Sequence, residues 1–343
     1  MPDETFPTLS RPTLESIARE ASVSMSTVSK VLNGRPGVSA RTRGVVEELL
    51  FRSGYARRGS ESEPGSLVEL VIESLASEWA LQIIRGVERV AREAGMTLAL
   101  TTRGYRHAPD QEWIAGVLKR KPIAVVLVFS DLSAEHRQQL HTRNIPFVVV
   151  DPAGDPAPDV PAIGATNWSG GVAATRHLVE LGHRRIGVIS GPDDLMCSRA
   201  RVAGYRSALD EAGIPIDPQL FGGGEFTQED GEREALRLLS RPNPPTAIFA
   251  GNDMQALGVY DAARRLGLSI PDELSVVGFD DIPPARWAGP PLTTVRQPLV
   301  EMAEEATRLA LRMRVETVES VRLDLATSLV IRRSTSEPLL PPD

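Results

Sequence analysis

The feature that most constrains the fold is a repeated alternation that begins after residue 66. Short continuous runs of apolar residues, such as IAVVLVFS and RIGVISG, are bounded by turn residues and separated by longer stretches with helical periodicity. Strands that are apolar on both faces are typical of parallel sheets covered by helices on both sides. The sequence therefore predicts a doubly wound α/β fold.

The alternation runs in two consecutive series, which predicts two lobes. One series runs from LVELVIES to FVVVD, and the other follows PAGDPAPDVPAIGATN and ends at LSVVGFDD. The final strand, helix and strand form no lobe of their own, so we expect them to complete the first. We assign residues 67–163 with 293–335 to lobe 1, 164–292 to lobe 2 and 336–343 to a disordered tail. Ligands of such sheets bind outside the carboxyl ends of the strands.

A different pattern occupies residues 1–58. Three short helices fit it, with Thr13, Ser24 and Ser39 as N-cap candidates ahead of apolar residues at helical spacing. The stretch TLESIAREASVSMSTVSKVLNG predicts a helix, a tight turn and a second helix. This helix-turn-helix motif places the N-terminal residues of its second helix in the major groove of DNA. Its short hydroxyl side chains permit close approach and can donate to phosphates.

The distribution of charged residues also favours DNA binding by this first segment. The chain has a net charge of -7, but residues 1–58 carry nine Lys and Arg against six Asp and Glu, a net of +3, which leaves -10 for the rest. A polyanion can meet the first segment while the remainder repels it. Residues 59–66 are a Ser, Glu, Pro and Gly linker. We expect a cytoplasmic protein, because nothing in the sequence marks export or a membrane span.

Several motifs in order resemble the lactose-repressor (LacI/GalR) family of bacterial transcriptional regulators. They are IAREASVSMSTVSKVLNG, LLFRSGY, LVELGHRRIGVISGP, TAIFAGNDMQALGVYDAARRLGLSIPDELSVVGFDD and PPLTTVRQP. The resemblance covers residues 13–335. It implies a homodimeric repressor with a DNA-binding headpiece, a hinge and a core like periplasmic sugar-binding proteins. It also implies an effector, expected to be a carbohydrate, between the lobes.

The resemblance assigns DNA contacts residue by residue. Base edges would be read by Met25, Ser26 and Lys30, of which Lys30 can donate to guanine. Backbone contacts would come from Ser24, Thr27, Ser29 and Asn33. Ser22 stands where the family often has glycine, which is acceptable if the backbone stays at negative φ. The linker lacks the leucine that kinks family operators, so we expect Arg57 and Arg58 to contact phosphates instead.

The resemblance also implies the effector contacts. Arg201 matches the ligand-binding arginine, a planar fork suited to hydroxyls or a carboxylate, and Arg199 lies too far around the helix to share the cleft. Asn252 and Asp280 match polar contacts, and Asp151 ends a strand on the same side. Trp79 and Phe226 match aromatic positions that flank a sugar ring. The alternatives are a surface ion pair for Arg201, core packing for the aromatic residues, and helix or turn capping for Asn252 or Asp280. Trp168 departs from a position that is commonly asparagine.

Two rival functions stay open at this point. A sugar-processing enzyme could use the strand-end carboxylates Asp253, Asp280 and Asp281, but we expect no catalysis, because no nucleophile or phosphate-binding motif occurs. A sugar-binding protein without a DNA role is the other. No cofactor or metal is expected, since the histidines have no metal-ligand spacing and Cys197, the only cysteine, fits a buried small residue. The tail has no heptad repeat for a tetramer, so we expect a dimer on a pseudo-palindromic operator.

Overall fold

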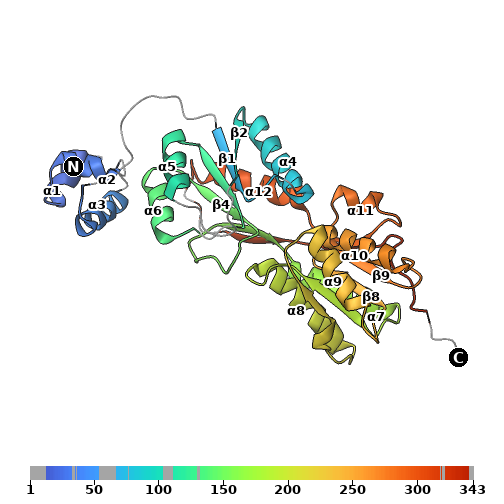
Figure 1. The fold of residues 1–343 in the computed structure, drawn as a ribbon. Coiled ribbons are helices and arrows are strands. Elements are labelled where there is room, and N and C mark those ends of the chain that lie inside the picture. The colour runs from blue at the N-terminus through green and yellow to red at the C-terminus, as the bar shows by residue number, and fades with distance from the viewer. Residues whose placement is uncertain are drawn as a thin grey trace, which may run out of the picture.

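A three-helix headpiece and two α/β lobes follow one another along the chain (Figure 1). The computed structural model describes residues 13–32, 35, 37–53, 67–75, 77–102, 111–129, 132–316, 318 and 321–339. Both lobes have a central sheet with helices on its two faces, as the alternation of apolar runs predicts.

Lobe 1 is a six-stranded, fully parallel sheet with two pairs of helices. Its strands are β1 (Leu67–Ile72), β2 (Thr97–Thr102), β3 (Ala124–Val128), β4 (Phe147–Val150), β5 (Ala162–Ala165) and β11 (Arg322–Leu325). They lie in the order β11-β5-β4-β3-β1-β2. Helices α4 (Glu78–Glu93) and α12 (Leu299–Arg312) cover one face, and α5 (Gln111–Arg120) and α6 (Ala134–Thr142) cover the other.

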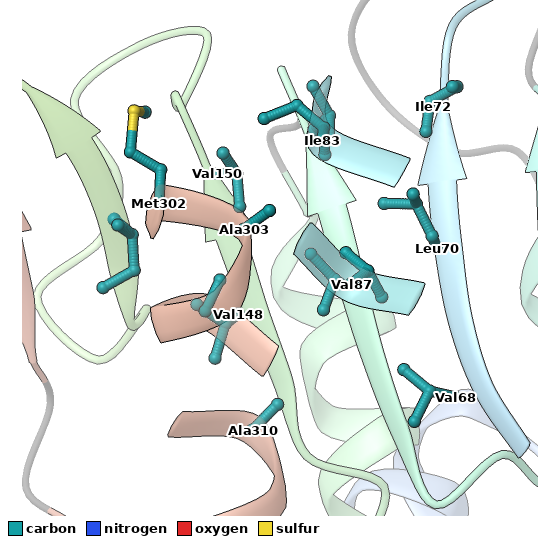
Figure 2. Packing of buried hydrophobic residues seen from close by; sticks show 14 of the residues in the cluster. Val68, Leu70, Ile72, Ile83, Val87, Val148, Val150, Met302, Ala303 and Ala310 are labelled. Carbon is teal, nitrogen blue, oxygen red and sulfur yellow. The ribbon is translucent and has the colours of Figure 1, made fainter. Parts of the chain in front are cut away.

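The face of this sheet under α4 and α12 illustrates how the apolar runs are used. Alternate residues of β1, Val68 and Leu70 among them, point toward Val87 of α4, while Val148 of β4 lies beneath Ala303 of α12 (Figure 2). These side chains are fully buried. On the opposite face of β1, Val71 packs with α5, and the one polar residue there, the fully buried Glu69, pairs with Arg120 of α5 at 2.6 Å, so both faces of the strand are covered.

Lobe 2 repeats the arrangement with one exception in strand direction. Its strands are β6 (Ile186–Ser190), β7 (Phe221–Gly223), β8 (Ala247–Ala250), β9 (Ser275–Asp280), β10 (Thr293–Arg296) and β12 (Ser328–Val330). They lie in the order β12-β10-β9-β8-β6-β7, with β12 antiparallel to β10. One face carries α7 (Asn167–Glu180) and α8 (Met196–Glu211), the other α9 (Gln228–Leu239) and α10 (Asp253–Leu266). A 3₁₀ turn, Pro218–Leu220, and α11 (Pro283–Trp287) complete the lobe.

The headpiece consists of α1 (Leu14–Glu20), α2 (Met25–Leu32) and α3 (Ala40–Arg52) around a core that includes Ile17, Val28 and Val46. All three predicted caps are confirmed. The Oγ1 of Thr13 accepts from the Ser16 amide in a capping box, and the Oγ atoms of Ser24 and Ser39 accept from the amides three residues later.

The turn between α1 and α2 differs from the expectation. Ser22 has φ of 55°, so the negative φ at which a serine would be acceptable here is not adopted. The turn places the Val23 amide on the Ala18 carbonyl at 2.9 Å, which closes α1 and aims the chain into α2. A left-handed backbone conformation favours glycine, and this chain forms it with serine at an energetic cost.

The predicted lobe boundaries need correction in three places. β10 and β12, within residues 293–335, belong to the sheet of lobe 2, while α12 and β11 belong to lobe 1. The reason is packing: Val295 of β10 is fully buried in the α7–α8 face of sheet 2, whereas Met302 of α12 fills the core of lobe 1. β5 also continues to Ala165, so lobe 2 begins later than residue 164. The chain therefore crosses between the lobes after β5, β10 and β11.

The third correction concerns the tail, predicted to be disordered over 336–343. Residues 336–339 are described, and Ser336 is held by lobe 2: its amide donates to Ser275 Oγ at 3.0 Å and its carbonyl lies 3.0 Å from His183 Nε2. Burial lowers the pKa of His183, and a carbonyl partner requires the proton on Nε2. Residues 340–343 lie outside the described part of the chain.

Replacing Ser22 with glycine should stabilise the headpiece by up to about 1 kcal/mol, because glycine adopts the left-handed conformation without steric cost. The measurement is amide hydrogen exchange over α1 and α2 in the full-length protein, which should slow. Ser22→Ala is the control, since alanine retains the Cβ and should bring no protection. Equal exchange in the glycine variant and the parent would contradict the strain.

Replacing Ser334 with alanine should destabilise lobe 2. Its side chain is fully buried, its Oγ accepts from the Thr293 amide at 2.8 Å and donates to the Val276 carbonyl at 2.6 Å. Removal leaves two buried backbone groups without that partner, at a cost of about 1 to 3 kcal/mol. Denaturant unfolding measures the loss, and Ser240→Ala, at an exposed helix end, is the control. Equal stability of the two variants would refute the role of Ser334.

Candidate functional site

Arg201 is the centre of the strongest candidate site. It lies in the second turn of α8, is 3% exposed, and extends across the carboxyl ends of the lobe 2 strands. Its Nε donates to Asn167 Oδ1 at 2.8 Å and its Nη1 to the Gly251 carbonyl at 2.7 Å. The guanidinium carbon lies 3.8 Å from the centroid of the Phe279 ring. Arg201 is therefore a buried, oriented cation, and a surface ion pair is excluded.

Two buried carboxylates lie near this cation. Asp280, the last residue of β9, has Oδ1 3.7 Å from Arg201 Nη1 and accepts from Gln297 Nε2 at 2.6 Å. Burial raises its pKa to about 7, against the opposing effect of Arg201. Asp151 follows β4 in lobe 1, and burial raises its pKa to about 6, again opposed by Arg201. Asp280 of lobe 2 thus lies beside Arg201, and Asp151 of lobe 1 lies within the electrostatic influence of the same guanidinium.

The aromatic side chains of Trp79 and Phe226, which were expected to flank a ligand, lie at the strand ends of the two lobes. Trp79, at the start of α4, stacks on Phe129 with centroids 4.9 Å apart. Phe129 and Phe226 both pack on a small buried cluster of Ala153, Leu195 and Cys197, which joins the two lobes. Both Trp79 and Phe226 are half-buried, and Trp79 also packs against the core of lobe 1, so the core-packing alternative describes part of its surface. They leave aromatic surface near the carboxyl ends of both sheets.

Close approach of Phe226 depends on a glycine. A Cβ built at Gly191, just after β6, would lie 2.2 Å from the Phe226 ring. Asn252 holds the same loop, because its Nδ2 donates to the Phe226 carbonyl at 3.2 Å, and its Oδ1 caps α10 by accepting from the Gln255 amide at 2.8 Å. Asn252 is therefore a helix cap in this structure, as the capping alternative has it. Its side chain also positions the loop that carries Phe226.

The carboxylates behind a possible enzyme are accounted for by structural partners. The side chain of Asp281 is 1% exposed and pairs with Arg296 at 2.7 Å and with Arg332. Asp253 is fully buried, accepting from the Ile282 amide at 2.9 Å and from the Thr294 hydroxyl. Among the described residues no group of three or more His, Cys, Asp or Glu could hold a metal ion. The described helices include none that is both long and apolar enough to cross a membrane.

A second candidate surface is the N-terminal half of α2. Met25 is 56% exposed, and Ser26 and Lys30 are also exposed. Thr27 and Ser29 are half-buried, and Ser24 Oγ lies 2.8 Å from Ser26 Oγ. At the other end of α2, Arg143, the residue that follows α6, donates to the Leu32 carbonyl at 2.6 Å. The headpiece thus rests on lobe 1 by one end of α2 and exposes the other. Asn33, Arg57 and Arg58 lie outside the described residues.

Comparison with known proteins agrees with this architecture. Residues 13–57 match the family described as bacterial regulatory proteins, lacI family, and residues 175–335 match the periplasmic binding protein-like domain. The HTH-type transcriptional repressor CytR of Escherichia coli (strain K12) is 32% identical over 328 residues, covering 94% of this chain and 96% of that protein. The chain belongs to the lacI family. The HTH-type transcriptional regulator CelR of Thermobifida fusca is 36% identical, covering 94% and 98% of the two chains.

Solved structures of lacI-family proteins have the same fold. A transcriptional regulator CelR–cellobiose complex has a TM-score of 0.72 at 34% identity, covering 94% of this chain and all of that one. A lac repressor dimer bound to operator and an anti-inducer has a TM-score of 0.70 at 25% identity, covering 95% and 99%. These relatives are DNA-binding regulators and not enzymes.

Sequence reasoning missed three residues that shape this lacI-family site. Asn167 orients Arg201, Gln297 holds Asp280, and Phe129 links the two aromatic positions. Phe129 lies at the end of the apolar run of β3, and Asn167 lies two residues after β5. Both positions could have been predicted from the sequence, because ligands of parallel sheets bind at the carboxyl ends of the strands. Gln297 follows β10, and the order of the elements in the sequence does not show that β10 belongs to lobe 2.

Proposed function

We propose that this protein is a dimeric transcriptional repressor that reads a pseudo-palindromic operator with α2 and is controlled by a sugar bound between its lobes. The observation that carries the proposal is the buried Arg201 at the strand ends, with Asp280 from lobe 2 and Asp151 from lobe 1 near it. A ligand that satisfies these groups contacts both lobes and favours one relative arrangement of them.

The DNA-reading half of the proposal rests on α2. Its exposed side carries short hydroxyl side chains and Met25 in the first turn and the cation of Lys30 in the last turn, and its apolar side is buried in the headpiece core. This division is what a recognition helix needs, because one face packs and the other approaches base edges. Arg57 and Arg58 are proposed to add phosphate contacts. Membership of the lacI family supports this assignment over a sugar-binding protein without a DNA role.

The effector half rests on the chemistry at the strand ends. Arg201 donates, Asp280 and Asp151 accept, and Trp79 and Phe226 offer flat apolar surface, which together suit the hydroxyls and the apolar ring face of a sugar. The related CelR structure is a cellobiose complex, which supports a carbohydrate here. A cytoplasmic location follows from the proposed role on operator DNA.

The function is tested by selecting binding sites for the full-length protein from random double-stranded DNA. The expected products are paired half-sites related by two-fold symmetry, bound by a dimer in light scattering. Adding the matching sugar should change the affinity for the selected site. Unpaired half-sites, or binding with no sequence preference, would contradict the proposal.

Lys30→Ala should weaken binding to the selected operator by about 1 to 3 kcal/mol and relax the preference at one base pair of each half-site, because a base-edge contact carries sequence information. Lys119→Ala, at an exposed lysine of α5 in lobe 1, is the matched control and should bind as the parent does. The measurement is operator affinity on the selected site and on single-base variants at one salt concentration. Uniform weakening across all variants would make Lys30 a phosphate contact instead.

Arg201→Ala and Asp280→Ala should each weaken effector binding roughly ten- to a hundredfold, since a hydrogen bond to a charged group contributes about 1.5 to 3 kcal/mol. Arg199→Ala is the matched control, because Arg199 is exposed on the same helix and donates to the carbonyls of Asp193 and Asp194 at 2.9 Å. Operator affinity is measured across an effector titration. Unchanged effector response would refute the assignment, and loss of operator binding without effector would give these residues a folding role.

A further inference from the structure

The contact between the headpiece and lobe 1 is a feature that neither the exposed side of α2 nor the Arg201 site accounts for. The headpiece lies beside α6 (Figure 1), and α3 lies against that helix. Arg143, the residue that follows α6, takes part in the contact. Its Nη2 donates to the carbonyl of Leu32, 111 residues away in the sequence, at 2.6 Å. Lobe 1 thus binds the end of the helix that is proposed to read DNA.

The Leu32 carbonyl is a suitable acceptor for an arginine. Leu32 is the last residue of α2, and the last four carbonyls of a helix have no partner within that helix. They also carry the negative end of the helix dipole, so a cation placed beside them is favourable. Arg143 therefore satisfies, from lobe 1, a backbone group that residues next to the helix usually satisfy.

Charged residues on α3 and α6 add to the same contact. Glu47 of α3 is half-buried, and burial raises the pKa of its carboxyl group above the ordinary value. Arg43 and Arg143 attract the ionised carboxylate, whereas Glu135 of α6 repels it. One arginine of lobe 1 thus attracts two groups of the headpiece, the Leu32 carbonyl and the Glu47 carboxylate. We call this contact the headpiece dock.

The headpiece dock leaves the proposed DNA-reading side of α2 uncovered. Met25, Ser26 and Lys30 are exposed in this arrangement. A contact that inhibits DNA binding by masking would cover these side chains. The headpiece dock instead holds α2 by its C-terminal end and presents its N-terminal half.

The covalent connection allows a small contact to hold the headpiece. Residues 54–66 separate Ser53, at the end of the described headpiece, from Leu67, at the start of β1. A tether of this length makes docking an intramolecular step with an effective concentration on the order of millimolar. A contact too weak to join two separate proteins is then well occupied, and a charge-assisted hydrogen bond is among the stronger polar contacts.

We propose that the headpiece docks on lobe 1 through Arg143 when the protein is free of DNA, and that the dock holds α2 in a preset orientation for the operator. The second clause rests on the proposed function, whereas the docking itself needs no DNA. Arg143 is a positioning residue, because it orients the reading helix without touching DNA. A released headpiece loses this orientation, so binding to two half-sites in register weakens more than binding to random-sequence DNA.

Docking is tested without DNA by amide hydrogen exchange of the full-length protein. Arg143→Ala should accelerate exchange in α2 and α3 about tenfold, because a hydrogen bond from a charged group is lost. Glu135→Gln should slow exchange there, because it removes the like charge near Glu47 and keeps the size of the side chain. Arg137→Ala is the matched control and should leave the headpiece unchanged, since Arg137 is a half-buried arginine of α6 that pairs with Asp159, also in lobe 1, at 3.4 Å.

Operator binding tests the preset orientation. On the site selected by the full-length protein, Arg143→Ala should bind about three- to tenfold more weakly because preorganisation is lost. Its affinity for random-sequence DNA and the salt dependence of its operator affinity should equal those of the parent. A salt slope reduced by about 0.9 would make Arg143 a phosphate contact and overturn the positioning role. Tighter operator binding would make the dock inhibitory and would also contradict the proposal.

The dock and the proposed function fail separately. Equal hydrogen exchange in the parent, Arg143→Ala and Glu135→Gln would show that the headpiece does not dock, and the proposed function would stand if the operator is still selected and bound. The expected changes in hydrogen exchange without any selected operator would confirm docking. That result would refute the proposed function together with the role of the dock in orientation.

Discussion

The burial of one guanidinium at the strand ends of lobe 2 is the constraint around which the site is arranged. Arg201 is removed from water, and that costs several kcal/mol in a protein interior unless its donors are satisfied. Asn167, from the start of α7, and Gly251, from the end of β8, satisfy two of them, and the Phe279 ring covers the guanidinium plane. The position of the cation is thereby fixed before any ligand arrives. The groups that fix it come from three separate parts of lobe 2: the start of α7, the residue after β8, and β9.

The carboxylates around Arg201 are held in a different way. Asp280 and Asp151 both have pKa values raised by burial, because a single guanidinium cannot compensate two buried negative charges. Hydroxyl donors from a ligand would favour the ionised carboxylates, and these donors need to reach both lobes at once. The site is therefore incomplete in the manner expected of a switch: Asp280 of lobe 2 has Gln297 and Arg201 as partners, whereas Oδ2 of Asp151, on lobe 1, has no hydrogen-bond partner among the described residues.

The sequence predicted the layers of the molecule better than their connections. Continuous apolar runs such as β1 and β9 can only be central parallel strands, and the capping residues of α1, α2 and α3 are local signals, so both were found. β10 and β12 were placed in the wrong lobe because an apolar run does not record which sheet it joins. Arg201 and Asp280 were found through the resemblance to a family, whereas Asn167 and Gln297, which hold them, are visible only when distant segments meet. Ser22 shows the same limit, since φ of 55° at a serine has no sequence signature.

The three crossings between the lobes suggest how occupation of the cleft reaches the DNA-reading surface. Lobe 1 is completed by α12 and β11, which enter it from β10 and leave it toward β12, so any rotation of one lobe on the other must be absorbed in these short connections. The described contact of the headpiece with the core is with lobe 1, through Arg143, the residue that follows α6, and the carbonyl of Leu32 at the end of α2. Burial raises the pKa of Glu47 on α3 in the same contact region, near Glu135 and Arg143. Lobe 1 thus both contains Asp151 and contacts the headpiece, and a ligand that repositions lobe 1 moves the support on which α2 rests.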